Sequence, residues 1–172
     1  CSSDLAKVQR PGVCNAMETL LVDSAIAKEA LPLLKVEFDK AHTELKGCKK
    51  TQAIIDVANA TDEDYDTEYL ANILNIKVVD GVEGAIEHIV RFSSGHSEAI
   101  ITQNVTAAET FLNAIDAAAV YLNASTRFTD GGAFGFGAEV GISTNKLHAR
   151  GPMGIEGLTT YKFKIYGSGQ TR

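Results

Sequence analysis

The sequence predicts an α/β fold in which a parallel sheet lies between two layers of helices. Short apolar runs recur along the first 122 residues, and segments with apolar residues at helical spacing lie between them. Strands that alternate with helices in this way are typical of a parallel sheet with helices on its faces. We therefore expect residues 1–122 to form one three-layer α/β domain.

The individual elements follow from the same patterns. Apolar runs predict four strands, at residues 18–22, 74–79, 99–102 and 118–122. Asp23 and Ser24 are good N-cap residues after the first run, and Asp80-Gly81 ends the second. Helical spacing of apolar residues predicts three helices, at residues 26–38, 82–90 and 107–116.

The alternation of strands and helices ends at Asn123. Residues 123–157 are rich in glycine, lack periodicity and are too long for an idle loop, so we expect them to pack against another part of the protein. The following segment predicts a strand with one apolar face, made by Tyr161, Phe163 and Ile165. Residues 123–172 are thus expected to be a glycine-rich loop and a C-terminal arm.

Composition limits the function classes. The chain has 172 residues, a net charge of −6 and no basic cluster longer than Lys49-Lys50, which argues against a nucleic-acid or anionic-membrane surface. No 18-residue apolar span or signal-peptide core occurs, so we expect a soluble, cytoplasmic protein. Because the chain does not begin with Met, we interpret it as a fragment.

The cysteines and histidines argue against structural metal sites and disulfides. Cys1, Cys14 and Cys48 are odd in number and form no C-x-x-C pair, which fits a reducing cytosol. The histidines lack Cys or His neighbours at ligand spacing, so no metal site is expected.

Cys14 is the candidate nucleophile. It follows the turn-forming pair Pro11-Gly12, and residues 14–17 are expected to begin a short helical turn. Free backbone N–H groups there, and Arg10 four residues away, favour the thiolate. The alternative is a buried, inert cysteine, and the local pattern leaves both interpretations open.

Two long motifs resemble one enzyme family. The segment R-P-G-V-C-N-A-M-E-T-L-L-V around Cys14 resembles the active-site signature of γ-glutamyl phosphate reductases, the proline-biosynthesis branch of the aldehyde dehydrogenase superfamily. Residues 121–154 are similar to the most distinctive block of that family. The resemblance covers essentially the whole chain but less than half of a family subunit. It implies a missing N-terminal cofactor domain, and it leaves open whether the parent is monofunctional or a bifunctional pyrroline-5-carboxylate synthase.

The resemblance also implies site residues. Cys14 matches the nucleophile, whose backbone N–H forms part of the oxyanion hole. Glu68 matches, more loosely, a Glu-aromatic motif that contacts the nicotinamide ribose, and the alternative is a solvated acid in an acidic run.

Four residues open the glycine-rich block and are candidates for substrate binding, because ligands gather where strands of α/β sheets end: Asn123, Ser125, Thr126 and Arg127. Arg127 is suited to hold an oxyanion, and its alternative role is a structural clasp for carbonyls. His148 and Arg150 are expected to order a turn. Residues 131–137 lack the strand–turn–helix context of a dinucleotide motif and are interpreted as close packing against the missing domain or a neighbouring subunit.

The implied function is the catalytic part of an NADPH-dependent reductase. Cys14 would attack L-glutamyl 5-phosphate, and reduction of the thioester would yield L-glutamate 5-semialdehyde. The C-terminal strand is expected to join subunits into a homo-oligomer, and this chain alone is expected to be inactive. The alternatives are a noncatalytic α/β interaction domain and a related aldehyde dehydrogenase of another substrate.

Overall fold

The structure is a computed structural model that describes residues 6–172. Its main feature is a four-stranded parallel sheet in the order β1-β4-β2-β3. β1 (Thr19–Asp23) pairs along its whole length with β4 (Ile73–Val79). The other edge of β4 pairs with β2 (Glu44–Gly47), and β3 (Ala58–Asn59) completes the sheet.

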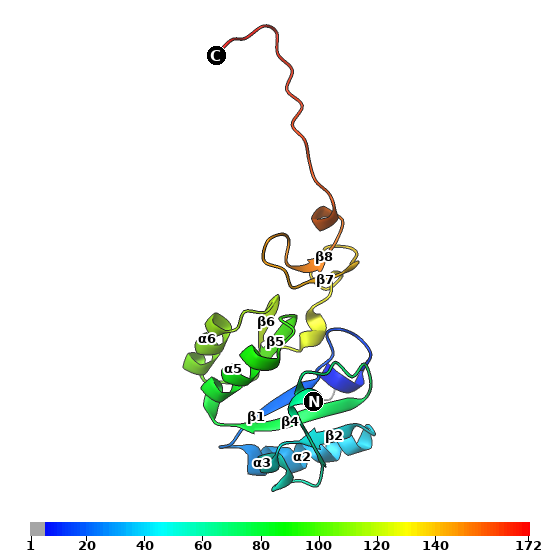
Figure 1. The fold of residues 1–172 in the computed structure, drawn as a ribbon, viewed down its shortest axis with the longest axis vertical. Helices are drawn as coiled ribbons and strands as arrows, with labels where there is room; N and C mark the ends of the chain where they lie inside the picture. The colour runs from blue at the N-terminus through cyan, green and yellow to red at the C-terminus, as the bar shows by residue number, and fades with distance from the viewer. Residues whose placement is uncertain (1–5) are drawn as a thin grey trace.

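Helices cover both faces of this sheet (Figure 1). α2 (Ala27–Lys40) and α3 (Lys49–Gln52) connect strands in the direction from β1 to β3, so right-handed crossovers place both on one face. α5 (Gly81–Phe92) leaves β4 toward a second sheet and lies on the opposite face (Figure 1). A single-turn helix, α4 (Asp62–Tyr65), precedes β4.

The core lies where β4 meets α2. Leu74 and Ile76 of β4 and Leu31 of α2 have no exposed surface, and Phe38 is almost as deeply buried. Burial of each such side chain stabilises the fold by about 1.5–3 kcal/mol. Five of the seven residues of β4 are apolar, as is typical of parallel strands with helices on both faces.

The second half of the chain is built from smaller units. β5 (Ser97–Ile100) pairs in parallel with β6 (Ala119–Leu122) across α6 (Val105–Ala114). After two loops and the 3₁₀ turn η1 (Thr126–Phe128), β7 (Gly141–Ser143) and β8 (Gly151–Met153) form an antiparallel pair, followed by η2 (Glu156–Leu158).

The α/β class with a parallel sheet is confirmed, and each predicted strand up to residue 122 has a counterpart. The strand predicted over 158–166 is wrong for this chain: no strand forms there, and Phe163 is 81% exposed. Figure 1 shows this segment extending away from the rest of the molecule. A strand needs a neighbouring strand to satisfy its backbone groups, and no strand of residues 6–172 pairs with this segment. Among the helices described, none has the length and apolar character needed to span a membrane.

Candidate active site

Cys14 lies in a tight turn immediately before β1. The backbone N–H of Ala16 donates to the carbonyl of Val13 at 3.0 Å, which closes the turn around the cysteine. The Met17 N–H donates to the Ala6 carbonyl at 3.0 Å and fixes the end of the loop. The Cys14 residue is exposed and its thiol is free.

Asn15 ties this turn to the segment that follows β6. Its buried side-chain amide donates to the carbonyls of Thr129 at 2.8 Å and Arg127 at 3.3 Å. In return, the Thr126 hydroxyl donates to the Asn15 carbonyl at 2.8 Å. The predicted substrate segment is therefore held directly against the candidate nucleophile.

Cys14 and Arg127 line one hollow of about 370 Å³, together with Arg10, Val13, Asn15, Asp130, Ala133 and Glu139. The Glu139 carboxylate accepts the Gly131 N–H at 2.7 Å, which fixes it at the wall of the hollow. A Cβ at Gly131 would lie 2.8 Å from the Glu139 Cβ, so this position requires glycine. At Gly131, the predicted close packing is made within the chain itself.

The pKa of the Cys14 thiol is shifted in the direction opposite to the prediction. Partial burial raises the pKa of the Cys14 thiol, the carboxylates of Glu139 and Glu68 raise it further, and Arg127 opposes them. The expectation of a lowered pKa at Cys14 was wrong, because the thiol is partly buried and because the carboxylates of Glu139 and Glu68, distant in sequence, lie near it.

The pKa of the Cys48 thiol is shifted in the other direction. Burial opposes its ionisation, but hydrogen bonds from the Thr51 hydroxyl and from backbone N–H groups outweigh burial and lower its pKa. The Cys48 Sγ lies 3.3 Å from the Thr51 Oγ1.

Glu68 is exposed and lies between α4 and β4. Its charge acts on the pKa of Cys14, so the fold brings the two residues near each other although 54 positions separate them in the printed sequence. The exposed carboxylate is open to a hydrogen-bonding ligand.

The remaining predicted site residues have structural contacts. The Ser125 hydroxyl accepts the Arg127 N–H at 3.2 Å and begins η1. Asn123 does not line the hollow: its amide accepts the Thr102 N–H and donates to the Thr102 carbonyl, both at 2.9 Å. It therefore clamps the ends of β5 and β6. Arg150 donates to the Asp116 carboxylate at 2.6 Å, which fits the ordering role expected of it.

Sequence reasoning missed Asn15 and Glu139. Asn15 was inside the quoted motif, but its bond to Thr129 spans 114 residues and has no local signal. Glu139 is the only acidic residue between Gly131 and Ile155, and an isolated carboxylate in a glycine-rich block is a signal that could have identified it.

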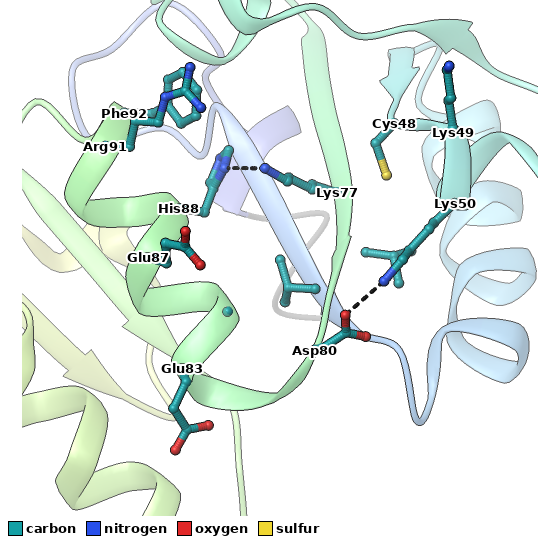
Figure 2. Close-up of a pocket in the computed structure, with 13 residues that line it drawn as sticks. Cys48, Lys49, Lys50, Lys77, Asp80, Glu83, Glu87, His88, Arg91 and Phe92 are labelled. Atoms are coloured by element: carbon teal, nitrogen blue, oxygen red, sulfur yellow. Dashed lines mark hydrogen bonds and ion pairs between the residues drawn. The ribbon is translucent and has the colours of Figure 1, made fainter.

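A larger hollow, of about 710 Å³, lies at the carboxyl ends of β2 and β4 (Figure 2). Lys77 donates to His88 Nδ1 at 3.0 Å, and Lys50 pairs with Asp80 at 2.8 Å. Burial, then the charges of Lys77 and Arg91, lower the pKa of His88 to about 4, so its imidazole is neutral near pH 7. Lys50 and Lys77 are thus both engaged with partners inside this hollow. Among residues 6–172, no three His, Cys, Asp or Glu side chains gather as a metal site would need.

The chain is similar to known proteins over nearly its whole length. The sequence profile described as "Aldehyde dehydrogenase family" matches residues 13–163. The chain is 86% identical over 167 residues to the gamma-glutamyl phosphate reductase of Sulfurimonas denitrificans and 85% identical to that of Sulfurovum sp., in each case over 97% of this chain and 41% of the relative.

Solved structures give the same result. The crystal structure of the gamma-glutamyl phosphate reductase from Thermotoga maritima superposes with a TM-score of 0.93 at 57% identity, over 99% of this chain and 42% of that one. The yeast protein of the same name superposes with a TM-score of 0.57 at 29% identity, over 78% of this chain and 34% of that one. The chain spans about two fifths of the length of the curated relatives it matches.

Proposed function

Because the chain belongs to the aldehyde dehydrogenase family, we propose that it is the catalytic part of a reductase that converts L-glutamyl 5-phosphate to L-glutamate 5-semialdehyde and phosphate. The observation that supports this proposal is the hollow that the Cys14 thiol and the Arg127 guanidinium line together. The names of the relatives supply the substrate.

In the first step, the Cys14 sulfur attacks the acyl carbon and phosphate leaves with the electron pair of the C–O bond. The raised pKa of Cys14 favours the protonated thiol, so its proton leaves as the sulfur attacks. The departing phosphate takes up this proton, and the step yields a thioester and hydrogen phosphate. Arg127 is placed to hold an anionic oxygen of the substrate, and the backbone N–H of Cys14 donates to the carbonyl oxygen. Covalent capture as a thioester divides one difficult reduction into two easier steps.

The second step needs a nicotinamide cofactor, proposed to be NADPH, which supplies hydride to the thioester carbon when bound. The exposed Glu68 carboxylate near Cys14 fits a ribose hydroxyl, which is a donor that a carboxylate accepts well. The Cys14 thiolate then leaves as the aldehyde forms. The rest of the cofactor site is assigned to the N-terminal part of the protein, so this chain alone should be inactive.

We assign different roles to the four residues predicted to bind substrate. Arg127 contacts the substrate, while Thr126 and Ser125 hold its loop against Cys14 through the hydrogen bonds described above. Asn123 acts as a clamp between strands and not as a ligand. The division into a catalytic domain, residues 1–122, and a loop with arm, residues 123–172, belongs to the same proposal.

The exposed C-terminal segment is proposed to pair with a second copy of the protein. Tyr161 and Phe163 stack edge to face at 5.4 Å, and both are exposed together with Ile165. A strand with an apolar face gains stability by adding to a sheet edge. The assembled enzyme is proposed to be cytoplasmic, without nucleic-acid or membrane partners.

The test is the full-length protein with Cys14→Ser, assayed by phosphate-dependent reduction of NADP⁺ with L-glutamate 5-semialdehyde. We expect the parent to be active and the variant to lose at least about 10⁴-fold in kcat, as removal of a covalent nucleophile does elsewhere. The exposed position of Cys14 predicts an unchanged melting temperature. An inactive parent, or a Cys14→Ser variant with full activity, would contradict the proposal and favour a noncatalytic domain.

A further inference from the structure

The hollow that holds the Cys14 thiol contains charges of both signs. Arg10 and Arg127 supply two guanidiniums, and Asp130 and Glu139 supply two carboxylates. In the part of the chain that the structure describes, none of these four side chains forms an ion pair. The Arg127 Nε is buried and has no hydrogen-bond partner there. The charged groups of this hollow are therefore available to a ligand that itself carries both signs.

The Glu139 carboxylate is held in place by the backbone around it. Its Oε2 accepts the Gly131 N–H at 2.7 Å, and the two residues pack so closely that a Cβ at Gly131 has no room. On the other side, the Val140 N–H donates to the Met153 carbonyl at 3.0 Å and joins the segment to β8. A carboxylate accepts hydrogen bonds at both oxygens. Glu139 can thus bind a further donor without giving up its bond to the backbone.

Asp130, the other carboxylate of the hollow, is engaged differently. Its Oδ1 accepts the Gly132 N–H at 2.9 Å and the Ala133 N–H at 3.0 Å, as in an Asp side chain that stabilises a turn. Burial, and then the charge of Glu139, contribute most to the raised pKa of the Cys14 thiol. Of the two carboxylates, Glu139 is therefore the better candidate for a ligand held beside the thiol.

The groups that face the same ligand from other segments are also fixed. The Lys7 ammonium donates to Glu18 Oε2 at 2.9 Å and closes the base of the loop that carries Cys14. Asn15 bonds this loop to the carbonyl of Arg127 at 3.3 Å. A site distinguishes between similar ligands when its groups are held in position before the ligand arrives. The hollow meets this condition at the thiol, at the guanidinium segment and at Glu139.

We propose that Glu139 binds the α-ammonium group of the substrate and so makes the enzyme selective for an amino acid. This inference rests on the proposed function, in which the substrate is L-glutamyl 5-phosphate. That molecule has a phosphate at one end and an α-carboxylate and an α-ammonium at the other. Arg10 and Arg127 match its two anionic groups, and Glu139 matches its only cation.

A carboxylate beside a thiol has two other conceivable roles, and both predict a different result. A general base would take the Cys14 proton during the attack on any acyl group. A structural residue would only hold the glycine-rich segment in place. Neither role depends on the amine of the substrate, whereas ammonium binding does. Substrates with and without the amine therefore separate the three roles.

The first experiment compares two aldehydes in the full-length enzyme, assayed by phosphate-dependent reduction of NADP⁺. L-Glutamate 5-semialdehyde has the amine, and 5-oxopentanoate is the same molecule without it. The parent should have the higher kcat/KM for L-glutamate 5-semialdehyde. Glu139→Gln should lower this kcat/KM about 10- to 100-fold, which is the effect of losing a hydrogen bond to a charged group. It should not lower kcat/KM for 5-oxopentanoate.

The variant is chosen to leave the fold intact, because the glutamine carbonyl can still accept the Gly131 N–H. The matched control is Glu109→Gln, at an exposed glutamate of α6 that lies outside the hollow, and it should change neither kcat/KM. Equal losses with both aldehydes would overturn the inference in favour of a general base or a structural role. A parent that shows no preference for the amine would overturn it without any variant.

The second experiment measures binding without turnover. The ligands are the phosphonate analogue of L-glutamyl 5-phosphate, in which a methylene replaces the bridging oxygen, and its counterpart without the α-amine. In calorimetry of the full-length parent, the amino analogue should have the lower Kd. Glu139→Gln should raise that Kd about 10- to 100-fold and leave the Kd of the other analogue unchanged. Equal Kd values in the parent would contradict ammonium binding.

The two proposals fail in different ways. A parent that binds the amino analogue through Glu139 but reduces no NADP⁺ would refute the reductase and leave ammonium binding standing. An active parent whose preference for the amine survives Glu139→Gln would refute ammonium binding alone. A parent that neither binds the analogues nor reduces NADP⁺ would refute both.

Discussion

Residues 6–122 and residues 123–172 differ in what supports their structure. In the described chain, all the large buried apolar side chains, from Val22 to Ile115, belong to the first region. The second region exposes most of its large apolar residues, among them Val140, Leu147, Ile155 and Phe163. The first region thus stabilises itself, whereas the second depends on contacts that it makes with the first or with other chains.

The candidate active site lies where these two regions meet. Cys14 and Glu68 come from the self-supporting region, and Arg127 and Glu139 come from the dependent one. The Cys14 thiol is therefore presented by a stable scaffold, while Arg127 and Glu139 are held by a few hydrogen bonds through Asn15 and Gly131. Mobile segments carrying binding groups on a rigid scaffold are common in enzymes.

The largest expected difference between the regions is in the cost of losing an apolar side chain. Ile76→Ala removes a side chain with no exposed surface and should lower the free energy of unfolding by about 2–5 kcal/mol. Phe163→Ala, at an 81% exposed position, should leave the unfolding of the monomer unchanged within about 0.5 kcal/mol. Urea denaturation of both variants measures this, and a comparable loss in each would contradict the division.

The pH dependence should separate the regions further, since His88 lies in the first one. Burial, Lys77 and Arg91 lower its pKa to about 4 from an ordinary 6.5, and Asp62 opposes them weakly. The unfolded chain binds this proton first, so stability is complete above about pH 6.5 and falls as the pH drops toward 4, by about 3 kcal/mol at most. His88→Gln should flatten this part of the stability–pH curve, and an unchanged curve would mean that the pKa of His88 is the same in the folded and the unfolded chain.

The Asn15→Ala variant tests the contact between residues 6–122 and residues 123–172. Asn15→Ala removes the two amide bonds to Thr129 and Arg127 and leaves buried carbonyls without their donor, which should cost about 1–3 kcal/mol. Hydrogen exchange should show faster opening of residues 126–139 while β4 stays protected. If β4 also opened faster, the two regions would unfold as one unit.

The smallest expected effect is a difference between the pH midpoints at which Cys14 and Cys48 are alkylated. The pKa of Cys14 is raised, most strongly by burial, and that of Cys48 is lowered by its hydrogen bonds. The alkylation midpoint of Cys14 should therefore lie at a higher pH than that of Cys48, in iodoacetamide labelling followed peptide by peptide. Glu139→Gln should lower the Cys14 midpoint and leave that of Cys48 in place.

The sequence predicted the fold class and four of the eight strands described in residues 6–172, namely β1, β4, β5 and β6, because long apolar runs such as that of β4 leave few alternatives. It missed β2, where only Leu45 is a buried large apolar residue among four positions. The buried face of α2 was not specified either: Leu33 is 72% exposed, while Leu31 has no exposed surface. Apolar residues occur around most of this helix, so its spacing did not specify the face that meets the sheet.

The candidate site was predictable only where a motif marks it. Cys14 and Arg127 were identified through resemblance, and they do line one hollow. The charge environment of Cys14 was not predictable, because its neighbour in sequence, Arg10, matters less than Glu139 and Glu68, which only the tertiary fold brings close.

The bond between Asn15 and Thr129 also has a consequence for the order of folding. The Lys7–Glu18 pair joins residues 11 positions apart, whereas Asn15 and Thr129 are 114 positions apart. Contacts at short sequence separation close early, and a ribosome delivers the N-terminal residues first. During synthesis the Cys14 loop can take shape long before its binding partners exist. The Cys14 loop can thus form while the other walls of its hollow are absent, and the hollow is complete only after Glu139 has emerged.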